Sequence, residues 1–111
     1  MISLTEEFDH CWAVFHPHFP QLQKPQLHIR FLRKAWGICR GKSAITLNRE
    51  LESANINFVR HVIFHEMCHL IHPNHKLEFY LLLSHFDPLR AAVESMKQKR
   101  LEELKSLKDE I

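Results

Sequence analysis

The chain has 111 residues, of which 45% are hydrophobic and 25% charged, and its formal net charge is +2. This composition is typical of a globular protein, so we expect residues 1–111 to form a single domain with a modest core. No apolar run approaches the roughly 18 residues of a membrane helix, and the acidic N-terminal segment does not resemble a signal peptide. We therefore expect no membrane contact. The three cysteines, Cys11, Cys39 and Cys68, are widely spaced and fit no disulfide framework, which favours a cytoplasmic protein.

The first predicted element is a helix that begins at Leu4. Ser3 and Glu6 have the spacing of a capping box, in which each residue satisfies a free backbone group of the first turn. Apolar residues then recur at helical spacing on one face: Leu4, Phe8, Cys11, Trp12 and Phe15. The segment 16–20 contains two prolines and ends this helix, because proline disfavours helical geometry in the residue before it.

Three strands are predicted next. Residues 26–31 alternate, with Leu27, Ile29 and Phe31 on the inner side of a half-buried strand. Residues 36–40 and 44–47 are predicted to form two more strands, joined as a hairpin through residues 40–43. A sheet of about three strands cannot close on itself, so a helix must cover one face. We therefore expect an α+β fold with a small antiparallel or mixed sheet.

The segment 24–49 carries seven basic residues and no acidic one. One interpretation is that these side chains cover the solvent faces of short strands and turns. The other is that the segment binds nucleic acid or an acidic protein segment by charge attraction. Because motifs for recognising bases or phosphates are absent, the first interpretation is preferred.

A central helix is predicted to follow a cap at Asn55 or Asn57. It is apolar on several sides, as expected of a buried helix. A charged Glu66 and several histidines inside such a helix would be costly without a partner, and a metal ion would supply one.

This helix contains the pattern His65-Glu66-x-x-His69. Histidines four residues apart share one helical face, so both imidazoles can reach one zinc ion. Glu66 stands beside the first histidine, where its carboxylate can accept a proton from a zinc-activated water. The pattern predicts zinc ligands at His65 and His69 and a general base at Glu66.

A third ligand must come from chain that has turned back, because Pro73 is expected to stop the helix near His72. His75 is the first histidine after this turn and is the preferred ligand, while Glu78, His72 and His85 remain alternatives. We expect His61 and His72 to line the pocket or to support the ligands.

Two further helices are predicted at the C-terminal end. Residues 76–86 are apolar enough to form a packed helix, and Asp87-Pro88 is a suitable start for the last one. The last helix carries a loose apolar stripe among many charges: Leu89, Val93, Met96, Leu104, Leu107 and Ile111.

Two segments together resemble the SprT-like zinc metallopeptidases and their YgjP-like and WLM relatives. The first comprises Trp-Gly-Ile-Cys at 36–39 and Ile-Thr-Leu-Asn at 45–48, and the second runs from Val62 to His75 and is followed by Phe79. The matching positions extend from about Leu27 to Tyr80. The resemblance implies a compact zincin-like domain with an N-terminal helix, a small sheet and an active-site helix. It also implies that His65, His69 and His75 bind zinc and that Glu66 is the catalytic base.

The leading functional hypothesis is a zinc metallopeptidase of the His-Glu-x-x-His type, which would cleave peptide or protein substrates through a zinc-activated water. The alternative is a module that holds zinc but only binds a protein or nucleic-acid partner. A purely structural zinc site is disfavoured, because such sites normally have four protein ligands and only three are identified.

Overall fold

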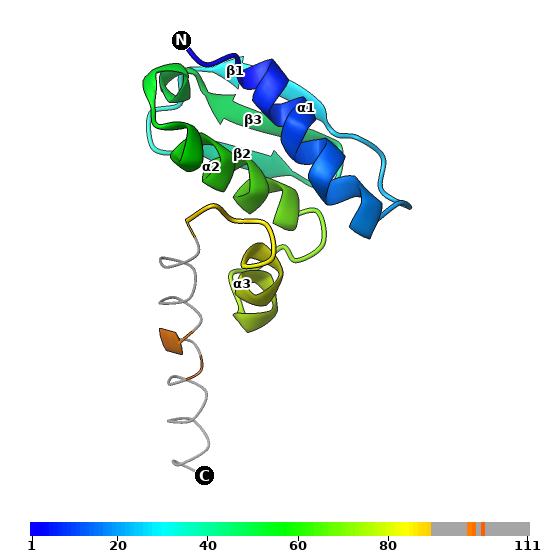
Figure 1. Ribbon diagram of the computed structural model, residues 1–111. Coiled ribbons are helices and arrows are strands. Elements are labelled where there is room, and N and C mark those ends of the chain that lie inside the picture. The colour runs from blue at the N-terminus through cyan, green and yellow to red at the C-terminus, as the bar shows by residue number, and fades with distance from the viewer. Residues whose placement is uncertain (90–97, 100, 102–111) are drawn as a thin grey trace.

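The computed structural model describes residues 1–89, 98–99 and 101. Within residues 1–89, three α-helices and three strands follow the order α1 (Leu4–Phe15), β1 (Gln26–Arg30), β2 (Gly37–Arg40), β3 (Ala44–Asn48), α2 (Ile56–Cys68) and α3 (Leu77–Leu83). Short 3₁₀ turns follow α1, at His16–His18, and β3, at Arg49–Ser53. This arrangement confirms the α+β class (Figure 1).

Helix α1 begins where the sequence predicts. The Ser3 side chain accepts a hydrogen bond from the Glu6 backbone N–H, so one of the free donors of the first turn is satisfied. The helix ends at Phe15 and passes into the 3₁₀ turn that contains Pro17. Its five predicted inward-facing residues are all buried, and they form one side of the core.

The sheet is mixed, in the order β1-β3-β2. Strand β1 pairs in parallel with β3, whereas β2 and β3 form the predicted antiparallel hairpin. Gly41 turns this hairpin with φ +57°, in the left-handed region that glycine adopts without steric cost. Strand β2 therefore lies at an edge of the sheet, with one side open.

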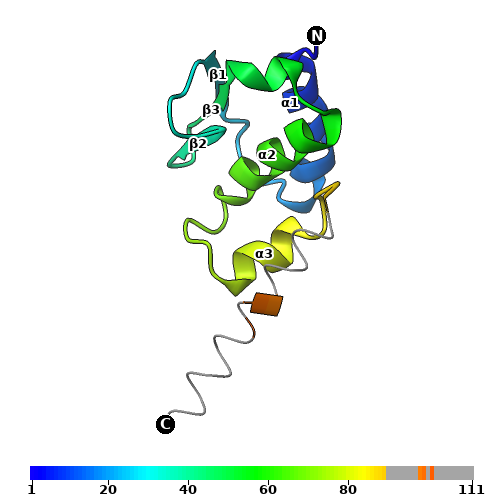
Figure 2. The ribbon, with the colours of Figure 1, turned by 90° about the vertical axis from the view of Figure 1, so that its left-hand side faces the viewer.

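Helices α1 and α2 lie side by side over one face of the sheet (Figures 1 and 2). Asn55 caps α2 by accepting a hydrogen bond from the Asn57 N–H, which selects the first of the two predicted capping residues. The buried residues of α2 occur on several sides of the helix, as expected for its central position. Phe8 and Phe15 of α1 and Ile63 of α2 are fully buried in the core between these layers.

The Asn48 side chain holds the loop that precedes β2 through hydrogen bonds. This side chain is buried; its amide group donates to the carbonyls of Leu32 and Ala35, at 3.0 and 2.9 Å. Its oxygen accepts from the Glu50 N–H, so the side chain also caps the next turn. The loop is therefore held in the position that leads Trp36 into the edge strand.

Three local predictions differ from the structure. Helix α2 ends at Cys68, with His69 as its cap, one turn before the end that Pro73 predicted. Phe31 lies beyond β1 and is 64% exposed, because the strand ends at Arg30 and the alternation is lost there. The packed helix predicted over residues 76–86 is shorter, as α3 covers Leu77–Leu83.

The last predicted helix lies almost entirely outside the described residues, but its proposed cap is visible. The Asp87 carboxylate accepts a hydrogen bond from the Leu89 N–H at 2.7 Å, as a helix-capping side chain does. Among the described residues, none of the helices combines the length and hydrophobicity that a membrane crossing requires.

Candidate metal centre

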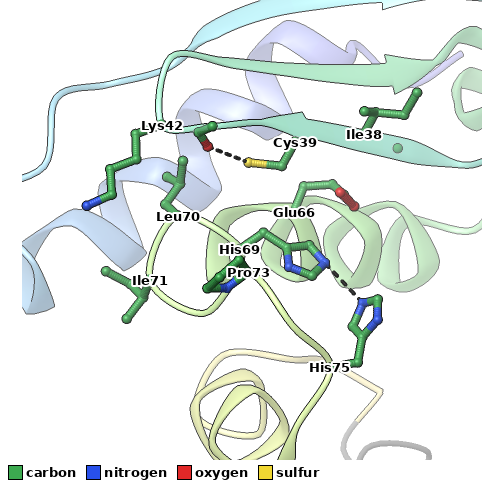
Figure 3. Close-up of a pocket in the computed structure, with 11 residues that line it drawn as sticks. Ile38, Cys39, Lys42, Glu66, His69, Leu70, Ile71, Pro73 and His75 are labelled. Carbon is green, nitrogen blue, oxygen red and sulfur yellow. Dashed lines mark hydrogen bonds between the residues drawn. The ribbon is translucent and has the colours of Figure 1, made fainter.

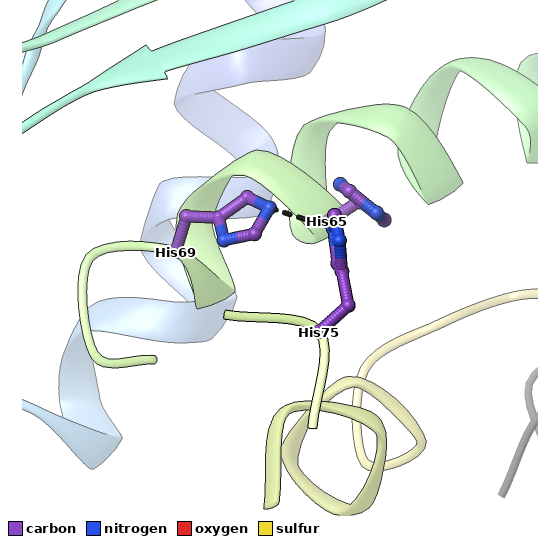
Figure 4. Close-up of side chains that lie close together, drawn as sticks. All are labelled: His65, His69 and His75. Carbon is purple, nitrogen blue, oxygen red and sulfur yellow. Dashed lines mark hydrogen bonds between the residues drawn. The ribbon is translucent and has the colours of Figure 1, made fainter. Parts of the chain in front are cut away.

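Three histidine side chains converge below the end of α2 (Figure 4). His65 lies in the last turn of α2 and His69 caps it, so the two rings share one face of the helix. His75 lies after Pro73, in the loop that leads to α3. One nitrogen from each ring lies within 4.8 Å of the other two, the one such group of potential metal ligands in the part of the chain that the structure describes.

The spacing of this cluster suits a metal ion. Nε2 of His69 lies 3.0 Å from Nε2 of His75. Two nitrogens bound tetrahedrally to zinc, each at about 2.0–2.1 Å, are roughly 3.3 Å apart, so a small outward rotation of the rings would admit the ion. Three neutral imidazoles also form a donor set that zinc prefers.

The ring of His69 is oriented by the backbone. Its Nδ1 lies 3.0 Å from the carbonyl oxygen of His72, which accepts a hydrogen bond when Nδ1 carries the proton. This contact leaves the lone pair on Nε2, the nitrogen that faces His75. His72 thus orients the His69 ring through its main chain, as backbone carbonyls often do for histidines around bound metals.

Phe79 of α3 packs among all three imidazoles. Its ring centroid lies 5.0 Å from that of His65, 4.6 Å from His69 and 4.9 Å from His75, and the side chain is fully buried. The chain reversal after α2 therefore brings back both the third histidine and the apolar side chain that positions all three.

Glu66 lies beside this cluster, between α2 and the edge strand β2 (Figure 3). The residue is only 5% exposed, and its Oε2 lies 3.2 Å from Nδ1 of His65. It also lies against Gly37: a Cβ placed there would come within 2.8 Å of Glu66 Cγ. Glycine at this position is what allows the strand to pass so close to the carboxylate.

A cavity of about 460 Å³ opens beside these groups, between β2 and the end of α2. Its lining includes Gly37, Glu66, His69 and His75. Lys42 lies at the end away from His75 (Figure 3). The histidine cluster and Glu66 are therefore accessible to a molecule that lies along the open edge of the sheet.

The two cysteines near the site are protonated thiols at neutral pH. Burial, with a smaller contribution from the charge of Glu66, raises the pKa of Cys39 to about 11. Burial, together with Asp87 and Glu66, raises the pKa of Cys68 further. Cys39 Sγ donates to the Gly41 carbonyl, and Cys68 is fully buried, so neither presents a thiolate to the cluster.

The side chains of the other sequence candidates do not join the cluster. Glu78, His72 and His85, the alternative third ligands, are not among the grouped potential ligands of the described residues. The seven basic residues of segment 24–49 are all exposed, which agrees with the solvent-face interpretation, and Lys24 pairs with Asp9.

Sequence reasoning missed two neighbours of the site. Gly37 lies within the predicted strand 36–40, and a glycine in a strand often marks a close approach of another group, so this signal was available. Asp87 contacts His61, with Oδ2 at 2.5 Å from Nδ1, although 26 residues separate them. No local pattern connects two residues so far apart.

Comparison with known proteins agrees with this geometry. A family model described as the YgjP-like metallopeptidase domain matches residues 3–100. No curated protein matches the chain. The fold is similar to that of the metallopeptidase zymogen jannalysin from Methanocaldococcus jannaschii, with a TM-score of 0.68 and 13% identity over 94% of this chain and 99% of that chain. Because the family model covers most of the sequence, the chain belongs to the YgjP-like family and forms a metallopeptidase domain, which implies a bound metal ion and peptide or protein substrates.

Proposed function

We propose that the protein is a zinc-dependent endopeptidase in which His65, His69 and His75 hold the metal and Glu66 is the general base. The observation that carries this proposal is the convergence of three imidazole nitrogens within 4.8 Å of one another, next to a buried carboxylate and an open cavity. Three protein ligands are typical of catalytic zinc, because the fourth position is left for water or substrate.

A bound zinc ion would supply Lewis-acid chemistry, polarising the scissile carbonyl and lowering the pKa of water to about 7. The Glu66 carboxylate would accept a proton from the attacking water as the water oxygen bonds to the carbonyl carbon. Glu66 would then pass this proton to the departing nitrogen as the C–N bond breaks. Contacts with His65 on one side and with Gly37 on the other fix the carboxylate between the cluster and the edge strand.

The edge strand offers a place for the substrate backbone. In an antiparallel pair, the backbone N–H and C=O groups of successive residues point alternately towards the partner strand and away from it. The Asn48 N–H donates to the Trp36 carbonyl, so Trp36 and every second residue after it point towards β3. The N–H and C=O groups of Gly37 and Cys39 accordingly face away from β3. An extended peptide can pair with these groups as an added strand, and its carbonyls would then pass in front of Glu66.

The test combines metal analysis with peptide cleavage. We expect stoichiometric zinc in the wild type, cleavage of unfolded protein or a peptide library, and loss of cleavage with retained zinc in Glu66→Gln. Glu78→Gln is the matched control, because this carboxylate is exposed and lies outside the cluster, and it should cleave normally. Zinc binding without any cleavage would favour the binding-module alternative, and unchanged cleavage by Glu66→Gln would overturn the proposed base.

A further inference from the structure

A second, smaller cavity adjoins the metal centre. It has a volume of about 210 Å³ and shares Gly37 and Glu66 with the larger cavity, and His65 forms part of its wall. The other lining residues come from the start of the hairpin and from the first turns of α2: Trp36, Phe58, His61 and Val62. A substrate side chain next to the scissile bond is therefore within reach of this cavity.

The walls of this cavity are mostly aromatic. The Trp36 and Phe58 rings meet edge to face, with centroids 5.4 Å apart, and the His61 ring is stacked on Phe58 at 6.1 Å. Trp36 is 46% exposed, which is unusual for so large an apolar side chain. Flat rings on adjoining walls offer an aromatic guest both stacking and edge-to-face contacts.

On the wall away from Glu66 and His65, the polar group of this lining is the His61 imidazole. Asp87 is 1% exposed, and its carboxylate accepts from the Leu89 N–H with Oδ1 and contacts Nδ1 of His61 with Oδ2. The buried carboxylate therefore fixes the orientation of the His61 ring. Within the described part of the chain, the second ring nitrogen, Nε2, has no hydrogen-bond partner.

We infer that this cavity selects a tyrosine side chain adjacent to the scissile bond, an inference that rests on the proposed peptidase activity. The phenol ring lies against Trp36 and Phe58, and its hydroxyl reaches Nε2 of His61. A phenol hydroxyl both donates and accepts hydrogen bonds, so it complements Nε2 in either protonation state of the imidazole. Phenylalanine fills the same space but leaves Nε2 unpaired, and alanine leaves the cavity empty.

The expected preferences follow from these contacts. Burying an aromatic ring raises kcat/KM about tenfold to a hundredfold over alanine. One hydrogen bond to a partly exposed histidine adds about threefold to tenfold for tyrosine over phenylalanine. Peptides that differ only at the residue on one side of the scissile bond measure both ratios, and mass spectrometry of the products identifies the bond that is cut.

Two substitutions separate the contributions. His61→Phe keeps the aromatic wall and should remove the preference for tyrosine over phenylalanine. Trp36→Ala leaves the His61–Asp87 pair intact, so it should reduce the preference for aromatic residues over alanine and retain the ratio of tyrosine to phenylalanine. Phe31→Ala is the control: this aromatic side chain is 64% exposed and lies outside the cavity, and its removal should change neither ratio.

A binding measurement keeps this inference independent of turnover. Trp12 is 8% exposed whereas Trp36 is 46% exposed, so a soluble quencher reaches mainly Trp36. In the Glu66→Gln protein, a tyrosine peptide should protect this fluorescence from acrylamide and an alanine peptide should not; Trp36→Phe should remove the response.

The outcomes distinguish this inference from the proposed function. Absence of both zinc and cleavage in the wild type would overturn the proposed function, and protection of Trp36 by the tyrosine peptide would still support the cavity. Cleavage with equal rates for tyrosine, phenylalanine and alanine, together with unprotected Trp36, would overturn the inference and leave the peptidase activity intact.

Discussion

Replacing Gly37 by alanine tests whether the edge strand fixes the position of Glu66. The added Cβ would lie 2.8 Å from Cγ, 3.2 Å from Cδ and 3.3 Å from Oε2 of Glu66. To restore an ordinary contact of 3.4 Å, Cγ must move by roughly 0.6 Å. Gly37 does not have a positive φ, so the backbone itself accepts alanine and the perturbation is purely steric.

The expected effect is mainly on kcat. Moving a catalytic group by about 1 Å can cost on the order of a hundredfold, so we expect kcat to fall about tenfold to a hundredfold. Overpacking this contact costs about 1–3 kcal/mol of the free energy of unfolding. Zinc affinity should be unchanged, because the three atoms nearest the added methyl group all belong to Glu66 and none to a histidine.

The assay compares steady-state kinetics, zinc content and urea unfolding of Gly37→Ala with those of Gly41→Ala. Gly41 has φ +57° and no atom within 4 Å of an added Cβ, so alanine strains the turn without reaching Glu66. It should lose about 1 kcal/mol of stability with a far smaller loss of kcat. A Gly37→Ala protein with wild-type kcat, or with zinc lost in parallel with activity, would refute the positional role.

Four other measurements test the same structure. Phe79→Ala should lower the free energy of unfolding by about 3–5 kcal/mol. It should also lower zinc affinity in a competition titration, because the three imidazoles lose their shared packing surface. Asn48→Ala should cost about 1–3 kcal/mol in urea unfolding, since two loop carbonyls lose their donor. Burial raises the pKa of Cys11 to about 12 and that of Cys39 to about 11, whereas thiols in the unfolded chain have a pKa of about 8.5. The unfolded state therefore loses its thiol protons first, and Tm should fall as the pH rises from about 8.5 towards 11. The fall in Tm should be smaller for Cys39→Ala. A chelator should lower Tm of the wild type, and His75→Ala should not respond to it.

The parts of the fold that local patterns determine were predictable. Ser3 caps α1, the hairpin turns at Gly41 and Asn55 caps α2, and each depends on residues only a few positions apart. The spacing of His65 and His69 is also local, because one helical turn separates them. His75 required one further step, the expectation that Pro73 reverses the chain, and the three rings do lie together.

What the sequence did not predict depends on contacts between distant segments. Helix α2 ends one turn before Pro73 would require, because the His69 N–H bonds to the carbonyls of Glu66 and Met67 and the chain then turns tightly. No single residue in this segment predicts that end. The approach of Gly37 to Glu66 and the pairing of His61 with Asp87 both follow from how the hairpin and α3 pack against α2. Such pairs become visible only when the layers are assembled.

Gly37 matters in two ways: it belongs to the edge strand β2, and it lies against Glu66. Among the described strands, β2 pairs only with β3, and its outer edge would leave room for the proposed extended substrate. A side chain at Gly37 would hold the strand away from α2, and the substrate would then lie further from the carboxylate. The absence of that side chain allows the open edge and Glu66 to lie in contact. Any replacement at Gly37 should accordingly lower activity in order of side-chain size, with serine close to alanine and valine far below both.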